Sequence, residues 1–264
     1  MKTNLAKAAA FGLLGVWFVG GSARAATVHT FFGEDFVNGN KAAARTNSAK
    51  ASSDFQSSLQ GVSTENFESF STGAKSPFTV MFGSDAATIT SASASDTFIE
   101  NTSGGAGISL FPTSGDKFIE TTTDMTLTFN KPQAAFGFWA TDIGDSGATS
   151  LILTLGNADK DKISVPAVFG IGGTGGQNAN GSVLFFGMIA DKGKEFTSVT
   201  FADNSGGSDH FGFDDMTIGE QGNVVSPPPP PPPTGVPLPA GVYPGMVLLG
   251  ALGAYSRLKT KVVC

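Results

Sequence analysis

The stretch DMTLTF at residues 124–129 indicates most directly which class of fold the chain adopts. Its apolar residues, Met125, Leu127 and Phe129, alternate with threonines, and a strand with one buried face has this period of two. Further short apolar runs follow from Glu65 onward, separated by clusters of Gly, Asn, Asp and Ser. We therefore predict an all-β fold, a jelly-roll-like two-sheet β-sandwich over residues 63–225.

The composition supports this fold class and limits the partners. The chain has 35 Gly and 23 Phe with only 14% charged residues, which favours short strands and turns over helices. All 22 acidic residues lie between Glu34 and Glu220, whereas six of the 16 Lys and Arg lie near the two ends. The domain between the ends therefore carries a net charge near −12. Such a charge repels phosphate backbones, so we expect no nucleic-acid partner.

Residues 1–25 have the features of a secretory signal peptide. A basic start precedes an apolar core at residues 8–20, which is too short to span a bilayer. The sequence Ala-Arg-Ala at residues 23–25 matches an A-x-A cleavage site. Because the only cysteine is Cys264 at the far end, we expect neither a disulfide nor a thiol or zinc site in the exported part.

The segment 26–62 is predicted to precede the sandwich and to contain a short helix. Residues 41–59 are rich in alanine and contain neither Gly nor Pro. Phe55 and Leu59 are four residues apart, so one face of such a helix could dock through these two side chains. Gly61 is placed to end the helix.

A proline-rich linker at residues 226–235 separates the sandwich from the C-terminal tail. Its seven consecutive prolines favour a polyproline II spacer, because proline fixes φ and donates no backbone hydrogen bond. Residues 238–255 carry no charge and, as a helix of ~1.5 Å per residue, would span about 27 Å, close to a hydrocarbon core of ~30 Å. We predict one C-terminal transmembrane helix, and the cations after it favour the cytoplasmic side.

The tail at residues 236–264 resembles the PEP-CTERM sorting signal in its VPLPA variant. The resemblance consists of a VPLPA motif, a short apolar segment rich in Gly and Leu, and a basic end at Arg257, in that order. Segments of the domain, such as FFGEDF and FGFDDMTIG, also resemble secreted proteins of this kind. The sorting motif consists of Val236, Pro237, Leu238, Pro239 and Ala240.

This resemblance implies a route out of the cell. An exosortase in the inner membrane of a Gram-negative bacterium would recognise and cleave the tail. The protein would then be anchored briefly and released to the cell surface or the extracellular matrix. A single-pass protein that keeps its tail as a permanent membrane anchor is an alternative that the sequence leaves open.

An acidic group is the best candidate for a metal site. Glu68 is predicted in the first strand of the sandwich, and Asp214 and Asp215 in the last; these two strands are commonly adjacent in a jelly roll. Asp214, Met216 and Ile218 alternate, so we expect them to share a buried face, where a bare carboxylate is costly. Oxygen ligands of this kind suit Ca²⁺, and similar pairs frame a structural calcium in carbohydrate-binding jelly rolls, a resemblance only. Hydrogen bonds to backbone amides are the alternative.

The loops after the strands supply a second candidate site. Trp139, with Asp142 and Asp145 close behind it, combines an aromatic ring with acids, as sugar-binding sites often do. We predict a structural or adhesive surface domain that contacts exopolysaccharide there, without catalytic residues. The alternatives are ordinary solvated turn residues, or a glycoside-active enzyme that uses paired carboxylates such as Asp142 and Asp215.

Overall fold

The computed structural model describes residues 28–38, 40–101, 110–143, 151–166, 181–202 and 210–225. The chain divides into two units, residues 1–225 and residues 226–264. The predicted signal peptide, linker and sorting tail lie outside the described residues. Among the described residues, one α-helix and one short 3-10 helix accompany the strands.

The described elements alternate rapidly along the chain, as the turn signals predict. The helices are α1 (Thr46–Ser57) and η1 (Gln221–Asn223). The strands are β1 (Val28–Phe36), β2 (Ser63–Glu65), β3 (Phe78–Phe82), β4 (Asp85–Ser91), β5 (Thr97–Asn101), β6 (Lys117–Thr121), β7 (Met125–Gln133), β8 (Ala135–Thr141), β9 (Leu151–Leu155), β10 (Lys162–Val165), β11 (Ser182–Ala190), β12 (Phe196–Ala202) and β13 (Phe211–Gly219).

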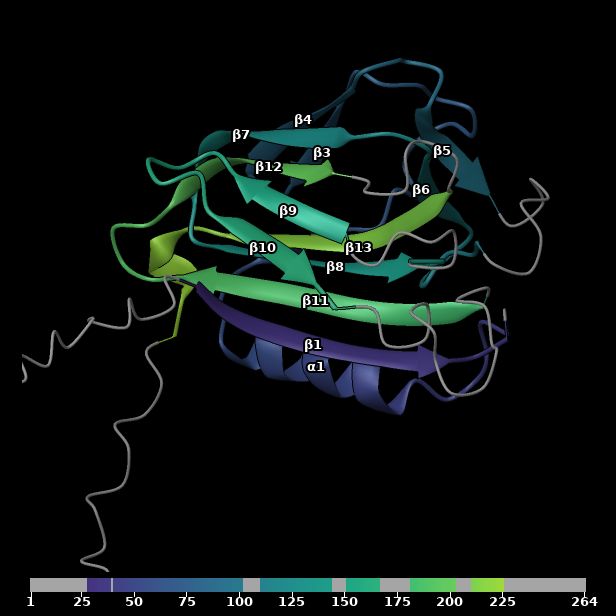
Figure 1. The fold of residues 1–264 in the computed structure, drawn as a ribbon, viewed down its shortest axis with the longest axis horizontal. Coiled ribbons are helices and arrows are strands. Elements are labelled where there is room, and N and C mark those ends of the chain that lie inside the picture. Colours follow the sequence, from purple (N-terminus) through teal and green to yellow (C-terminus); the bar gives the residue numbers. More distant parts are fainter. Residues whose placement is uncertain are drawn as a thin grey trace, which may run out of the picture. The chain divides into compact units, whose positions relative to one another are not determined.

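These strands form two antiparallel sheets packed face to face (Figure 1). The seven-stranded sheet has the order β1-β11-β8-β13-β6-β5, with β2 also pairing with β13. The six-stranded sheet has the order β10-β9-β12-β7-β4-β3. From β6 to β13 the chain crosses between the sheets at every step except β9 to β10, which is jelly-roll connectivity. The predicted all-β sandwich is confirmed.

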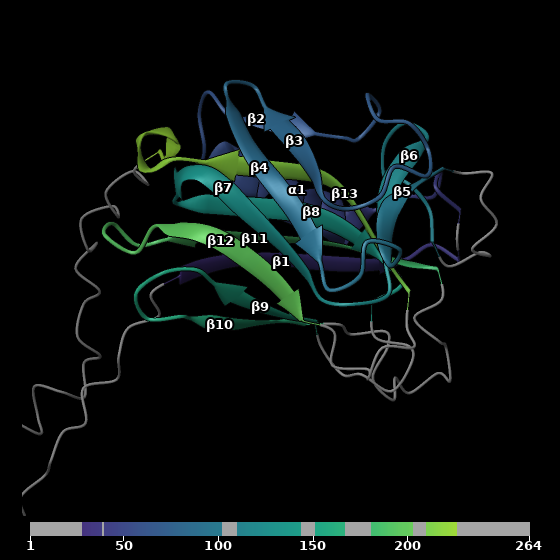
Figure 2. The same cartoon turned by 90° about the horizontal axis from the view of Figure 1, so that it is seen from above.

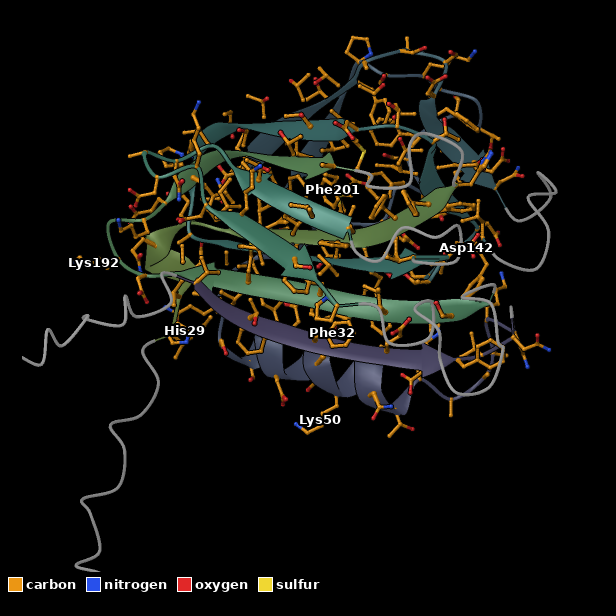
Figure 3. The ribbon with its side chains drawn as sticks, viewed as in Figure 1. His29, Phe32, Lys50, Asp142, Lys192 and Phe201 are labelled. Carbon is orange, nitrogen blue, oxygen red and sulfur yellow. The ribbon has the colours of Figure 1, made fainter. Side chains whose placement is uncertain are left out.

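Aromatic side chains fill the space between the sheets. Phe201 lies between them in Figure 3, with its ring centroid 4.9 Å from that of Phe213 and 5.1 Å from that of Phe138. All three are buried. In β7 the burial alternates, with Met125, Leu127 and Phe129 inside and the threonines between them more exposed. The period of two in the sequence thus corresponds to a strand with one face in the core.

Helix α1 covers part of the other face of the seven-stranded sheet. Figure 1 shows the helix below β1, on the outer side of this sheet, and in Figure 2, seen from above, the strands largely cover it. Phe55 is fully buried there, and a Cβ added to Gly137 of β8 or Gly187 of β11 would lie 2.6–2.7 Å from its ring. The prediction that a helix docks through Phe55 is confirmed. Leu59 is also buried, although the helix ends before it, at Ser57.

The start of α1 is held by the strand that precedes it. Asp35 of β1 accepts hydrogen bonds from the backbone N–H of Asn47 (3.1 Å) and Ser48 (2.8 Å). These two groups lie in the first turn of the helix, where backbone N–H groups have no acceptor within the helix itself. Because β1 pairs with β11 along its whole length, part of the segment predicted to precede the sandwich belongs to its sheet.

Strand β13 contains a bulge that changes which residues face the core. Asp214 pairs with Trp139 and Thr217 with Gly137, so β13 has one residue more than β8 over this interval. Asp215 has a φ of 46°, in the left-handed region that Asp tolerates better than most residues. The prediction that Asp214, Met216 and Ile218 share one face is therefore wrong. Met216 and Ile218 lie in the core, whereas Asp214 is buried on the opposite face of the sheet.

Candidate functional site

Three predicted acids converge on one loop, residues 113–117, which leads into β6. Strand β2 pairs with β13, which confirms that the first strand of the predicted sandwich lies beside the last. Glu68, however, lies in a turn after β2 and not in the strand itself. Strand β13 pairs with β6 before the bulge and with β2 after it. Near this change of partner, carboxylates bind both ends of the 113–117 loop.

Asp214 and Asp215 bind the first two residues of the 113–117 loop. Oδ2 of Asp214 accepts hydrogen bonds from the backbone N–H of Thr113 (2.7 Å) and of Ser114 (3.0 Å). The two carboxylate oxygens of Asp215 accept hydrogen bonds from the hydroxyl groups of the same residues, at 2.8 Å from Thr113 and 2.7 Å from Ser114. The bulge places two consecutive carboxylates on the same loop, which a regular strand could not do because its side chains alternate.

Glu68 binds the other end of the 113–117 loop. Its Oε1 accepts hydrogen bonds from the backbone N–H of Asp116 (2.8 Å) and of Lys117 (2.7 Å). A Cβ at Gly115, where φ is +53°, would lie 2.3 Å from this oxygen, so a side chain there would displace the carboxylate. The alternative named for these acids, hydrogen bonds from backbone amides, is what the structure shows for Glu68 and Asp214, whereas Asp215 accepts hydrogen bonds from hydroxyl groups.

The environment of Asp214 disfavours its charged form. Burial raises the pKa of Asp214 to about 8, and the neighbouring charge of Asp215 acts in the same direction. Backbone hydrogen bonds from Ser114, Asp215 and Thr113 act in the opposite direction but do not outweigh the burial. A carboxyl with this pKa keeps a proton at neutral pH that it would lose in the unfolded chain.

Arg45, which immediately precedes α1, lies beside the same loop. Its guanidinium donates to the backbone oxygen of Thr113 (2.9 Å) and lies 5.7 Å from the ring centroid of Trp139 and 5.9 Å from that of Phe111. Burial lowers the pKa of Arg45, whereas the charges of Asp215 and Asp214 raise it. The arginine thus places a positive charge near Asp214 and Asp215 and connects the loop to the start of the helix.

Trp139 and Asp142 are parts of the packed structure. The indole of Trp139 is half-buried, packs edge-on against Phe185 at 5.6 Å and is covered by Arg45. Asp142 is only 4% exposed and has a φ of 63°, so its carboxylate is not displayed on a solvated loop. Asp145, the third residue of the predicted sugar site, lies outside the described residues.

The described residues include no group of three or more His, Cys, Asp or Glu side chains arranged to hold a metal ion. Glu68 and the Asp214–Asp215 pair bind opposite ends of the loop, and protein donors occupy their oxygens. Calcium binding at these residues stays a prediction, and an ion there would have to replace some of these donors.

Within the part of the chain that the structure describes, no helix has both the length and the apolar character needed to cross a membrane. The predicted crossing segment, residues 238–255, and the VPLPA motif lie outside that part.

Comparisons with known proteins report limited similarity. No known protein family matches the sequence, and neither does any curated protein. Among solved structures, the K2 cleaved adhesin domain of Lys-gingipain is 15% identical, with a TM-score of 0.37 over 60% of this chain and 97% of that domain. The catalytic domain of a GH87 α-1,3-glucanase is 16% identical, with a TM-score of 0.30 over 61% of this chain and 30% of that chain.

The residues that sequence reasoning missed at this site are Thr113, Ser114 and Arg45. Thr113 and Ser114 occur in a run of small polar residues with no local pattern that marks them as partners of acids about 100 residues later. Arg45 precedes a helix and gives no sign that its side chain lies over aromatic rings. Only the pairing of the strands brings these residues together.

Proposed function

We propose that this chain is an exported surface or matrix protein in which the β-sandwich is displayed by a removable sorting tail. The signal peptide, the VPLPA motif, the apolar segment and the basic end carry this proposal, because each occurs in the order that such processing requires. An exosortase is the partner that would cleave the tail.

The way the sandwich ends supports a spacer role for the linker. The backbone N–H of Val225 donates a hydrogen bond to the backbone oxygen of Ser58 (2.9 Å), and Val224 forms an antiparallel β-bridge with Leu59. The proline run begins at Pro227, two residues later. In the sequence, the folded part is therefore followed directly by the run predicted to form a stiff spacer, as a display stalk requires.

We further propose that the outer face of the six-stranded sheet contacts exopolysaccharide. On this face, uncharged residues with hydroxyl side chains lie opposite one another across three neighbouring strands, β4, β7 and β12. The two rows are Thr88, Thr128 and Ser198, and Thr90, Thr126 and Thr200. Hydroxyl groups both donate and accept hydrogen bonds, which suits a polymer of sugar hydroxyls. Trp139 and Asp142, by contrast, are engaged within the fold.

The sorting proposal is tested by blocking the processing step. We expect replacement of Pro237 and Pro239 by alanine to leave the protein in the membrane fraction with an intact C-terminus. Mass spectrometry of the C-terminus and fractionation provide the measurement. The matched control is alanine at Pro229 and Pro231, which makes the same chemical change in the linker and should leave release unchanged. Complete release of the Pro237, Pro239 variant, or an intact Cys264 on wild-type protein in the medium, would contradict the proposal.

The polysaccharide proposal is tested with the domain, residues 26–225. Retention on the matrix polysaccharide of the producing cells is compared for the wild type and for Thr88→Asp, which places a charge at the β4 end of one hydroxyl row. We expect reduced retention of the variant, and Trp139→Phe, which leaves this face unchanged, serves as the control. If the wild type itself is not retained, the binding role is wrong.

A further inference from the structure

The four sheet edges in the described part of the chain differ in how they are protected. Edge strands expose unpaired backbone groups, and proteins usually cover them or interrupt them with Lys or Pro. The edge of β5 is covered, because residues 73–76 form backbone hydrogen bonds with Thr97 and Ile99 at 2.7–3.0 Å. The edge strand β10 has only four residues, begins with Lys162 and is followed by Pro166, and β3 has five residues and follows Pro77.

Strand β1 is a longer edge without these protections. It has nine residues with neither Lys nor Pro, and within the described residues it pairs only with β11. Between β1 and α1 runs a groove of about 350 Å³, lined by Thr30, Phe31 and Phe32 of the strand and by Lys50 and Asp54 of the helix, among others. Consecutive side chains point to opposite faces of a strand, so a groove that touches both Phe31 and Phe32 follows the hydrogen-bonding edge.

The accessible part of this edge is its first half. Farther along, Asn47 of α1 donates to the backbone oxygen of Glu34 (3.2 Å), and Gly33 is buried against the backbone of Asn47. Residues 28–32 remain accessible along the edge. Thr30, Phe31 and Phe32 line the groove, and His29 and Thr30 are exposed. A second strand can therefore pair over about five residues, a usual strand length.

We propose that the second strand is β1 of another copy of this chain, paired antiparallel about a two-fold axis at Thr30. This register is self-complementary. Val28 of each copy faces Phe32 of the other, which pairs apolar side chains on the core side. Thr30 faces its own equivalent across the axis, and no like charges are opposed. A two-fold interface of this kind is the commonest in homo-oligomers.

The two-fold axis is perpendicular to the sheet, so it keeps both α1 helices on the same side and makes them antiparallel.

The dimer would also place both six-stranded sheets on the same side of the joined seven-stranded sheets. If the proposed polysaccharide contact is right, two hydroxyl faces then address one polymer together, which increases retention through avidity. The pairing itself rests only on the edge of β1 and does not depend on that contact.

Sedimentation equilibrium of the domain, residues 26–225, tests the proposal. The part tested has its own core, because all the described core residues lie within it. We expect a wild-type dimer and, for Thr30→Asp, at least about tenfold weaker dimerisation, since two carboxylates face each other across the axis. The matched control is Thr88→Asp, the same change at an exposed strand position in the other sheet, which should leave the dimer intact.

A wild type that is monomeric at the highest soluble concentration overturns the proposal, as does equal weakening by Thr30→Asp and Thr88→Asp. The failures are distinguishable: a wild type that dimerises but is not retained on the polysaccharide contradicts the binding role and leaves the dimer standing.

Discussion

Strands β7 and β11 lie in opposite sheets and differ in how much of each is buried. In β7 buried and more exposed residues alternate, whereas all nine residues of β11 are buried. The outer face of the six-stranded sheet meets solvent, while α1 covers the outer face of the seven-stranded sheet at β11. The comparison shows that a continuous apolar run in an antiparallel sheet requires a cover on its second face.

Two glycines make this cover possible. Gly137 and Gly187 are opposite one another in β8 and β11, and the ring of Phe55 occupies the space where their side chains would be. Glycine ordinarily weakens a strand, so its presence at adjacent positions marks the close approach of another group. The apolar run of β11 and the helix more than 120 residues earlier thus form one packing unit.

The largest expected effect is the loss of the Phe55 side chain. Phe55→Ala should reduce the free energy of unfolding by about 3–5 kcal/mol, because it removes a fully buried ring and leaves a cavity over the sheet. Chemical denaturation measures this. Thr128→Ala on the solvent face of β7 is the matched control and should change stability by less than about 0.5 kcal/mol. Similar effects for the two variants would show that α1 is not the cover on which the seven-stranded sheet depends.

The next effect concerns Asp214, which lies on the covered face of the seven-stranded sheet. Burial raises its pKa in the folded protein to about 8, above the unfolded value, so the folded state binds more protons between the two values. This contribution to stability is complete below the unfolded pKa and is lost as pH rises through the folded pKa. The free energy of unfolding should fall by about 2 kcal/mol from pH 6 to pH 8 through this group.

Asp214→Asn should remove this part of the pH dependence, whatever it does to stability at a single pH. The measurement is denaturant unfolding at several pH values between 6 and 8, for wild type and variant. Parallel pH profiles for the two proteins would show that the pKa of Asp214 is not raised in this way.

The smallest of these effects comes from the start of the covering helix. Burial raises the pKa of Asp35, but hydrogen bonds from Ser48 and Asn47 outweigh it and lower the pKa. Its stabilising contribution is therefore present above the unfolded pKa and is lost as pH falls through the lowered value. Asp35→Ala should cost about 1 kcal/mol at neutral pH, as the loss of a helix cap does. Asp116→Ala, an exposed acid facing Lys41 at 3.6 Å, should cost less, and thermal unfolding of both variants compares them.

Local patterns predicted much of the fold. The alternation in β7 identified a half-buried strand. The turn residues marked the boundaries of short strands, and there were enough of these strands to form two sheets. Phe55 was identified as a docking residue because it lies in an alanine-rich segment without Gly or Pro. These features depend on neighbouring residues, which the sequence displays directly.

The candidate site was less predictable. The sequence identified Glu68, Asp214 and Asp215 as acids that lie near one another, and all three do bind the same loop. It did not indicate that Asp214 lies on the face away from Met216, because a bulge depends on the pairing partner and leaves no local signature. Trp139 was interpreted as part of a sugar site because Asp142 and Asp145 follow it. Its contacts with Arg45 and Phe185 come from residues far away in the sequence, so no local pattern indicates them.

The sequence by itself determined the fold class, since hydrophobic periodicity is a property of adjacent residues. It also supplied the order of the predicted signal peptide, domain, proline spacer and sorting motif, on which the proposed route rests. Only the tertiary structure decided which face each acid occupies, which strand is an unprotected edge and which glycines receive Phe55. Those outcomes depend on contacts between segments far apart in the chain, and pairing and burial fix them only when the whole sandwich forms.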